Sequence, residues 1–378
     1  MIYFDNSATT KPFDEVLETF TIVSKKYFAN PSSLHKLGAE SERLLNQARR
    51  FAAELLLVEP NELIFTSSGT EGNQLAIKGA AYFYQHRGKH IITTQIEHPS
   101  VLEACKQLEK EGFEVTYLPV QRDGRVAVEE VEKAIREDTI LVSMIHVNNE
   151  TGTIQPIEAI GSIVEEKKTV IFHVDHVQGF AKVPLHFKKA NIDLCTMSGH
   201  KIHGLKGTGM LYVRKGVKIE PLFTGGGQEF SLRAGTENVP GIVALVKALR
   251  LSKEKYKENR ATILAIEQYM RRELEAITGV YINSPIEHHA KHILNVSFTL
   301  FKPETIVHAL DEKEIYVSTK SACSSKGEEK SHVLAACGLG EMREKSSIRF
   351  SFSYENTLQQ AKTCVDEIRK IVKELQEV

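Results

Sequence analysis

The hydrophobic positions of this chain alternate between short buried runs and longer amphipathic stretches. Short apolar or β-branched runs predict strands at 63–66, 90–94, 114–118, 140–145, 170–175 and 208–213. Apolar residues at helical spacing predict helices at 14–27, 40–58, 74–84, 100–111, 128–136 and 157–167. Repeated strand–helix units are typical of an α/β fold, in which helices cover both faces of a largely parallel sheet.

The pattern changes after about residue 238. A long helical stretch is predicted at 239–278, with a polar break near 253–260, and it would bridge two domains. Further along, the pattern predicts strands at 293–298 and 348–352, a short helix at 304–311 and a strongly amphipathic helix at 357–375.

The length of 378 residues also favours more than one domain. We expect a large domain over 14–255. A smaller α+β domain would be formed by 1–13 and 256–378.

Composition and charge limit the classes of partner. The formal net charge is -1, so the chain has no general attraction to nucleic acid or to an anionic membrane. No apolar run approaches the roughly 20 residues of a membrane span. The start, Met1–Asp5, has neither the basic nor the long apolar segment of a signal peptide. Five scattered cysteines without a Cys-x-x-Cys pair fit a reducing compartment and argue against a disulfide framework, so we expect a cytoplasmic protein.

The segment Ser198–Gly204 carries the most specific chemistry. It places Lys201 on a connection between the predicted strands at 170–175 and 208–213, with a glycine on each side. Glycine lets the backbone approach a ligand closely, and burial lowers the pKa of a lysine and frees its amine for imine chemistry. A solvated loop lysine is the alternative. Asp175 and Gln178, at the end of the preceding strand, favour a reactive site.

A second candidate site is the Ser/Gly/Thr turn at 67–73, between a predicted strand and a predicted helix. Free N–H groups and the dipole at a helix start bind phosphate well, although the turn could also be a simple helix cap. The turn is not a P-loop, because no Gly-Lys-Ser/Thr follows. The missing Gly-x-Gly-x-x-Gly after the first strand disfavours a nicotinamide enzyme.

Polar segments follow several of the predicted strands. They are Glu97–Pro99, Asn148–Glu150, Asp175–Gln178 and the segment around Lys201. Ligands of open α/β sheets bind beyond the carboxyl ends of the strands. These residues are therefore predicted to meet at one site.

Ten motifs in collinear order resemble the NifS/IscS cysteine desulfurases, which are pyridoxal-phosphate (PLP) enzymes of the class V aminotransferase group. The motifs are Tyr3–Thr10, Asn30–His35, Ser68–Glu71, Glu97–His98, His146–Gly152, His173–Asp175, Ser198–Lys201, Gly225–Glu229, Arg233–Thr236 and Ser321–Cys323. The resemblance extends over essentially the whole chain. It implies PLP fold type I, the aspartate-aminotransferase-like fold, with a mostly parallel seven-stranded sheet in the large domain and a smaller α+β domain. The long segment between Cys323 and Val333 is similar to the NifS/IscS branch, group I.

The resemblance implies three central roles in PLP chemistry. Lys201 would bind PLP covalently and act as a base at the substrate Cα. Asp175 would pair with the ring nitrogen and keep it protonated, so that the ring acts as an electron sink. His98 would stack on the ring and move protons, with a pKa near the working pH.

The remaining cofactor contacts are also implied by the resemblance. The phosphate would be held by Gly69, Thr70, Ser198 and His200. Gln178 and Asn149 would hydrogen-bond the phenolic oxygen and the substrate. Thr236 would reach the phosphate of the neighbouring subunit, which predicts a homodimer.

The substrate implied is L-cysteine. Arg349 would pair with its carboxylate, and Asn30 and Asn149 would contribute to binding. Cys323, on an exposed loop at about 320–332, would attack the sulfur and take it as a persulfide, leaving alanine. Lysines beside Cys323 favour its thiolate. The other cysteines, Cys105, Cys195, Cys337 and Cys364, have apolar or helical surroundings and are predicted to be bystanders.

Departures from the family pattern bear on the sulfur acceptor and on the cofactor environment. His176 stands where a small residue is usual, and Leu205 stands where proline is common. The chain ends at Val378, without the C-terminal tail that IscS-type members use to dock an iron–sulfur scaffold. The acceptor would be either such a scaffold or a tRNA-thiolating sulfurtransferase of the ThiI type.

Other interpretations stay open. Another class V PLP enzyme, such as a small-amino-acid aminotransferase or a selenocysteine lyase, would share most of these motifs. Two histidine clusters, His288–His292 and His173–His176, suggest a metal-binding protein, but the first is predicted to be a solvated run. We therefore expect no metal site. A catalytically inactive scaffold is disfavoured because Lys201, Asp175 and Cys323 are all present.

Overall fold

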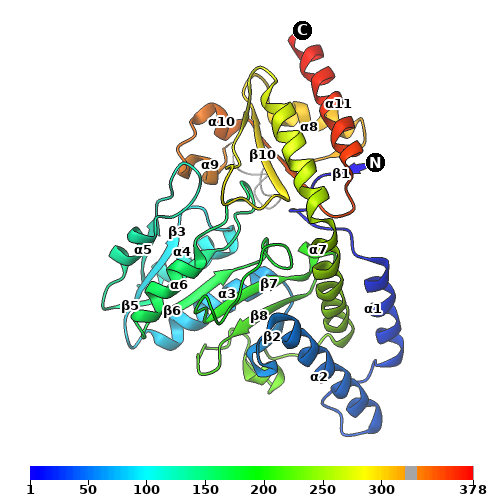
Figure 1. The fold of residues 1–378 in the computed structure, drawn as a ribbon. Coiled ribbons are helices and arrows are strands. Elements are labelled where there is room, and N and C mark those ends of the chain that lie inside the picture. The colour runs from blue at the N-terminus through cyan, green and yellow to red at the C-terminus, as the bar shows by residue number, and fades with distance from the viewer. Residues whose placement is uncertain (320–329, 378) are drawn as a thin grey trace.

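The fold is known from a computed structural model that describes residues 1–319 and 330–377 (Figure 1). Its main feature is a seven-stranded sheet, in the lower half of Figure 1. In spatial order its strands are β2 (Leu63–Thr66), β8 (Gly209–Val213), β7 (Leu194–Ser198), β6 (Ile171–Asp175), β5 (Thr139–Ile145), β3 (His90–Thr94) and β4 (Glu114–Leu118).

The sheet is mostly parallel, as the sequence predicts. Only β8 runs antiparallel to its neighbours, β2 and β7, and every other pair is parallel. The sequence predicts a direct connection through Lys201 from the 170–175 strand to the 208–213 strand. The structure corrects this prediction, because β7 lies between these two strands along the chain. Leu194–Ser198 mixes cysteine, threonine, methionine and serine and has no β-branched aliphatic run, so its pattern is weak.

Helices cover both faces of this sheet. Ile91 and Leu141 point into a core shared with α3 and α4, whereas the next residues, Ile92 and Val142, point into the opposite core, which includes α6 and part of α7. Strands buried on both faces are mostly apolar, which explains the nearly continuous apolar runs in the sequence. The helices are α1 (Asp14–Lys26), α2 (Lys36–Leu56), α3 (Gly69–Tyr84), α4 (Pro99–Lys110), α5 (Val128–Ala134), α6 (Ile157–Glu166) and α7 (Val239–Glu275).

A further core lies in the upper part of Figure 1, around a three-stranded antiparallel sheet of order β12-β10-β9. The strands and helices of this part of the chain are β9 (Val280–Ile282), β10 (Ile293–Phe298), β12 (Ser347–Ser351), α8 (Pro303–Asp311), α9 (His332–Ala336), α10 (Glu341–Lys345) and α11 (Leu358–Gln376). Beside it, β1 (Ile2–Tyr3) pairs in parallel with β11 (Ile315–Tyr316).

The helix α7 links the two parts. Its residues up to Leu251 pack in a core of the large sheet, and those from Ile263 to Leu274 pack in the upper core. The predicted polar break at 253–260 does not interrupt the helix, which is continuous over 37 residues. The division of the chain near residue 255 into two domains remains a prediction. In the part of the chain that the structure describes, no helix is long and apolar enough to cross a membrane.

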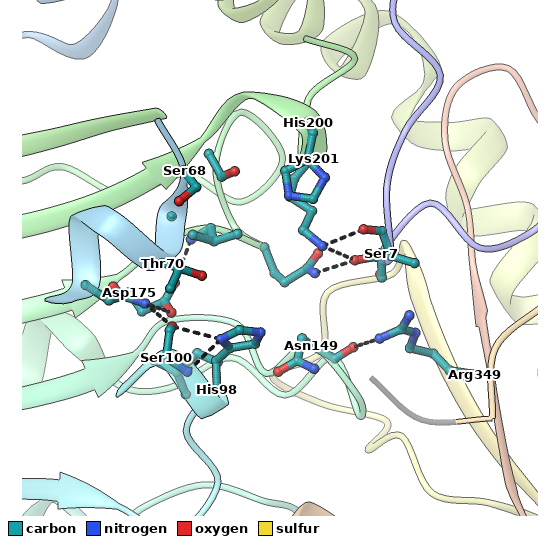
Figure 2. Close-up of a pocket in the computed structure, with 17 residues that line it drawn as sticks. Ser7, Ser68, Thr70, His98, Ser100, Asn149, Asp175, His200, Lys201 and Arg349 are labelled. Atoms are coloured by element: carbon teal, nitrogen blue, oxygen red, sulfur yellow. Dashed lines mark hydrogen bonds between the residues drawn. The ribbon is translucent and has the colours of Figure 1, made fainter. Parts of the chain in front are cut away.

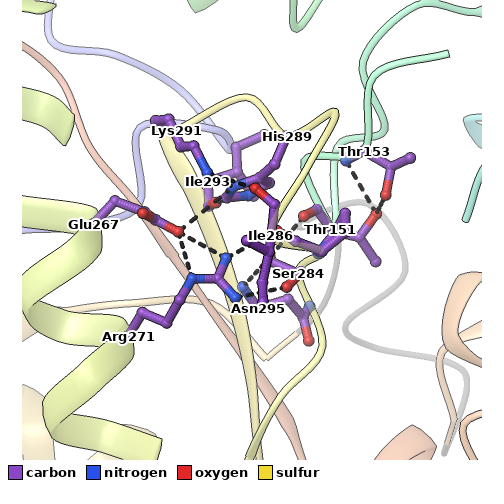
Figure 3. A network of polar contacts seen from close by, with 11 residues as sticks. Thr151, Thr153, Glu267, Arg271, Ser284, Ile286, His289, Lys291, Ile293 and Asn295 are labelled. Atoms are coloured by element: carbon purple, nitrogen blue, oxygen red, sulfur yellow. Dashed lines mark hydrogen bonds and ion pairs between the residues drawn. The ribbon is translucent and has the colours of Figure 1, made fainter. Parts of the chain in front are cut away.

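Figure 3 shows how α7 is tied to the neighbouring loops. Glu267 forms a 2.7 Å ion pair with Arg271, and the Arg271 guanidinium also donates a hydrogen bond to the Ser284 carbonyl at 2.8 Å. The Ser284 hydroxyl in turn donates to the Thr151 carbonyl at 2.6 Å. These contacts fix the loop that carries Asn149.

The histidine run at 288–292 is not uniformly solvated, which corrects the prediction. His288 is exposed, but His289 and His292 are buried. The reason is that Nε2 of His289 bonds the Ile293 carbonyl at 2.7 Å and so turns the ring inward, beside Glu267.

Candidate active site

One pocket lies at the carboxyl edge of the large sheet, and most of the predicted site residues line it (Figure 2). The sheet geometry explains this, because β5, β6 and β7 end here and α3 begins here. The predicted residues that line it are Gly69, Thr70, His98, Asn149, Asp175, Gln178, Ser198, His200, Lys201 and Arg349.

Three predicted residues are not among those that line this pocket. Thr236 lies in a neighbouring pocket, beside Ser67 and Arg233. Asn30 is exposed in the turn before α2, where its side chain accepts a hydrogen bond from the Ser32 amide at 2.8 Å. Cys323 lies outside the described residues. The roles of all three remain predictions.

Lys201 follows β7 on a short 3₁₀ turn, Gly199–Lys201. Its Nζ donates to the carbonyl oxygens of Ser7 at 2.7 Å and Ala8 at 2.8 Å. The Ser7 carbonyl also accepts from Nε2 of Gln178 at 2.9 Å, as Figure 2 shows. The N-terminal segment is therefore a wall of the site.

Asp175 ends β6 and is buried beneath the pocket. Its Oδ1 accepts from the Val177 amide at 3.0 Å, and its Oδ2 accepts from Nδ2 of Asn73 at 2.8 Å. Burial raises the pKa of this carboxyl group, whereas the two hydrogen bonds and the charge of Lys201 lower it. A buried carboxylate of this kind is stabilised by a cationic group placed beside it.

His98 caps the start of α4 and faces the pocket. Its Nδ1 accepts a 3.1 Å hydrogen bond from the Ser100 amide and lies 2.8 Å from the Ser100 hydroxyl. Burial is the main reason that the pKa of His98 falls to about 4, and the charges of Lys201 and His332 lower it further. This pKa corrects the near-neutral value expected from the sequence, since the sequence does not show how deeply the ring is buried.

The other end of the pocket has the features of an anion site. The 16-residue helix α3 begins at Gly69, and Ser68 caps it by accepting from the Glu71 amide at 3.1 Å. A Cβ at Gly69 would lie only 2.8 Å from a methyl group of Val177, so any larger residue would force this side chain to shift. The Ser198 hydroxyl is buried and has no hydrogen-bond partner among the described residues. Unpaired donors at a helix start suit a phosphate.

Arg349 enters the pocket from β12, on the side opposite the sheet (Figure 2). One terminal nitrogen donates to the Asn149 carbonyl at 2.9 Å, and the other pairs with Asp5 at 3.1 Å. Its Nε is buried and has no hydrogen-bond partner in residues 1–319 and 330–377. The guanidinium is thus held in place with donor capacity left for a carboxylate.

Sequence reasoning missed Ser7, Asn73 and Ser100, which also line the pocket. Ser7 belongs to the motif Tyr3–Thr10, for which the sequence predicts no role in the site. Asn73 lies near the start of α3 beside other polar residues such as Gln74, and Ser100 follows His98 by two positions. A buried polar residue needs a partner, and this signal could have revealed Asn73 once its burial was known.

His176 and Leu205, the two residues that depart from the family pattern, are not among the residues that line this pocket. His176 is buried, with its Nδ1 2.8 Å from Nδ1 of His146, and burial lowers the pKa of both rings. One ring must therefore donate a proton to the other. Leu205 packs against the core that contains α6.

Comparison with known proteins places the chain in a family. The aminotransferase class-V family matches residues 2–363. The chain belongs to this family. Among class-V relatives, the cysteine desulfurase IscS of Methanosarcina thermophila is 45% identical, over 99% of this chain and 92% of the relative. The putative cysteine desulfurase IscS 1 of Bacillus subtilis is 44% identical, over 99% of both chains.

Solved class-V structures share the fold. A NifS-like protein has a TM-score of 0.93 and 39% identity, covering 98% of this chain and 99% of that one. A structure described as SspA in complex with cysteine has a TM-score of 0.82 and 36% identity, covering 93% and 99%. The predicted fold class and the predicted resemblance to NifS/IscS proteins are therefore confirmed.

Proposed function

We propose that this protein is a PLP-dependent cysteine desulfurase. It converts L-cysteine to L-alanine and transfers the sulfur to Cys323 as a persulfide. The observation that carries the proposal is the convergence of Lys201, Asp175 and His98 on one pocket with a helix start suited to phosphate. The full-length similarity to cysteine desulfurases selects this reaction within the class-V family.

The pocket residues fit PLP in one orientation. The phosphate belongs at the start of α3, near Ser198 and His200, and the ring nitrogen belongs beside the buried carboxylate of Asp175. When bound, PLP withdraws electrons from the substrate Cα. Lys201 holds the cofactor and moves the Cα proton, and its position is set by the Ser7 and Ala8 carbonyls.

The substrate is held by its carboxylate. Arg349 faces the pocket with its Nε unpaired, so a cysteine carboxylate can accept from its guanidinium. Asn149 stands beside it, because the Asn149 carbonyl bonds the same guanidinium. Asn30, in contrast, is exposed, and we propose its contact with the substrate from the family resemblance alone.

We propose that Cys323 is the cysteine that takes the sulfur from the substrate. Its family motif supports this role, and the other cysteines are too deeply buried for it. Cys105, Cys195, Cys337 and Cys364 are all buried, and burial raises the pKa of each thiol. A thiol with a raised pKa forms little thiolate at neutral pH and is a poor nucleophile. The outer sulfur of the Cys323 persulfide is then transferred to a separate acceptor protein. This protein is either an iron–sulfur scaffold or a tRNA-thiolating sulfurtransferase of the ThiI type. We propose that this occurs in the cytoplasm.

The test is Cys323→Ser in the PLP-loaded protein. We expect the variant to bind L-cysteine, seen as a shift of the visible absorption band, but to form almost no alanine and no persulfide. Loss of a covalent nucleophile costs several orders of magnitude in rate. Alanine is measured by chromatography and the persulfide by mass spectrometry of the intact protein.

The matched control is Cys364→Ala, which removes a buried thiol from the upper core and should leave the rate nearly unchanged. Pyruvate, ammonia and sulfide formed from cysteine by Cys323→Ser at a rate close to that of wild-type turnover would refute the desulfurase and indicate a β-elimination lyase. The sulfur-containing keto acid 3-mercaptopyruvate as the product would indicate an aminotransferase.

A further inference from the structure

A chain of hydrogen bonds links the two catalytic candidates Asp175 and His98 beneath the pocket (Figure 2). Asp175 accepts from Nδ2 of Asn73 at 2.8 Å, and the same Nδ2 lies 2.8 Å from the Ser100 hydroxyl. The Ser100 hydroxyl lies 2.8 Å from Nδ1 of His98. Asn73, Ser100 and Asp175 are all buried, so water does not compete for these contacts.

The direction of each hydrogen bond follows from the donors available. An Asn73 amide nitrogen has two hydrogens, and these two contacts use both. The Ser100 oxygen therefore accepts from Asn73, and its single hydrogen is free to donate to His98. The Asn73 carbonyl oxygen, which is buried without a partner in the described part of the chain, agrees with an amide that acts here only as a donor.

The same reasoning fixes the tautomer of His98. Its Nδ1 accepts from the Ser100 backbone amide, and an amide N–H can only donate. Nδ1 thus carries a lone pair and receives two donors, the amide and the hydroxyl. The ring proton must be on Nε2, and the positive end of the α4 dipole further disfavours a proton on Nδ1.

We propose that Asn73 and Ser100 are positioning residues that lock His98 as the Nε2–H tautomer, with that N–H presented to the pocket as a hydrogen-bond donor. The donor role rests on the function proposed above, whereas the tautomer does not. This series of hydrogen bonds also couples Asp175 to His98, because Asn73 must keep its amide oriented toward both the Asp175 carboxylate and the Ser100 hydroxyl.

The test uses the PLP-loaded protein labelled with ¹⁵N-histidine, in which His98 signals are assigned by their loss in His98→Gln. We expect a non-protonated Nδ1 and a protonated Nε2 at neutral pH. In Ser100→Ala one donor to the neutral ring is lost, so the pKa of His98 should rise by about half to one unit. The acidic limb of the pH–rate profile should move to higher pH by the same amount, and Ser100→Thr should restore both.

A matched control exists in the same sheet. Ser143, on β5, lies 2.8 Å from Nδ1 of His173, a buried pair that does not line the pocket. Ser143→Ala should leave the His98 signals and the rate profile unchanged.

The outcomes separate the two proposals. A protonated Nδ1 on His98, or an unchanged His98 pKa in Ser100→Ala, would overturn the positioning role. If the tautomer and the pKa shift are as predicted but the protein forms no alanine from cysteine, the proposed function is rejected. The positioning role of Asn73 and Ser100 then still stands.

Discussion

Glu97, the residue before His98, shows how burial changes a single side chain. Its carboxyl oxygen Oε1 accepts from the Thr94 hydroxyl at 2.7 Å and from the Ile145 amide at 2.9 Å. Its Oε2 is buried without a partner among the described residues. Burial raises the pKa of Glu97 to about 8, and the charge of Asp175 contributes in the same direction. Glu97 therefore holds a proton in the folded protein at a pH where the unfolded chain has lost it.

This difference predicts how stability depends on pH. Below the ordinary pKa of 4.5 both states are protonated, and between about 4.5 and 8 the folded state loses stability as the pH rises. Glu97→Gln keeps the Oε1 acceptor and cannot ionise. From pH 5 to pH 8 the free energy of unfolding of the variant should gain about 4 kcal/mol relative to wild type, at about 1.4 kcal/mol per pKa unit. Unfolding at fixed PLP concentration measures this, and parallel pH curves for the two proteins would contradict it.

At the scale of elements, a buried ion pair holds the segment that leads to Thr236. Arg49 of α2 makes a two-pronged contact with Glu229, at 2.9 and 2.6 Å, and both residues are buried. Glu229 also accepts from the Phe65 amide of β2 at 2.8 Å. The segment Glu229–Ser231 has three consecutive positive φ angles, of 45°, 59° and 64°. Such angles are strained in residues other than glycine, and the ion pair helps to hold the backbone in this shape.

Breaking this ion pair should destabilise the protein and disturb the segment. Glu229→Gln leaves the Arg49 charge buried with a weaker partner, and we expect a loss of about 3 kcal/mol in the free energy of unfolding. PLP affinity should fall as well if the segment carries Thr236 to the cofactor. Lys133→Ala is the control, because its pair with Glu130 is exposed on α5 and should have little effect. Equal stability of the two variants would show that the buried pair does not clamp the segment.

At the scale of the whole molecule, the placement of Thr236 bears on the dimer. Within one chain Thr236 is not among the residues lining the pocket that contains Lys201. The family resemblance implies that it reaches the phosphate of the neighbouring subunit. If so, one subunit can supply Lys201 while the other supplies Thr236 to the same site.

Mixed dimers test this directly. Lys201→Ala removes the covalent attachment, and Thr236→Val removes one hydroxyl while keeping the side-chain shape. Homodimers of either variant should be impaired, but a mixed dimer should contain one complete site and recover activity toward half of the wild-type value per dimer. Light scattering should give the mass of two chains for each sample. If Thr236 acts within its own subunit, mixing will restore nothing, because no site has both residues.

The sequence by itself determined most of the strands and helices and the identity of ten residues that meet in the pocket. The physical reason is local. Strands buried on both faces are mostly apolar, and parallel strands bring their carboxyl ends to one edge, so residues such as Asp175 and Lys201 meet there. The strand β7 escaped detection because Cys195, Thr196 and Ser198 weaken its pattern, although the cores on both faces of the sheet bury it fully.

Tertiary structure decided what depends on contacts between distant segments. The pKa of His98 follows from burial and from Lys201, and the tautomer follows from the capping of α4 and from Ser100, held by Asn73. Lys201 is oriented by carbonyl oxygens about 190 residues earlier in the chain, at Ser7 and Ala8. Backbone carbonyls have no sequence signature, and burial is set only when the sheet and its helices pack together.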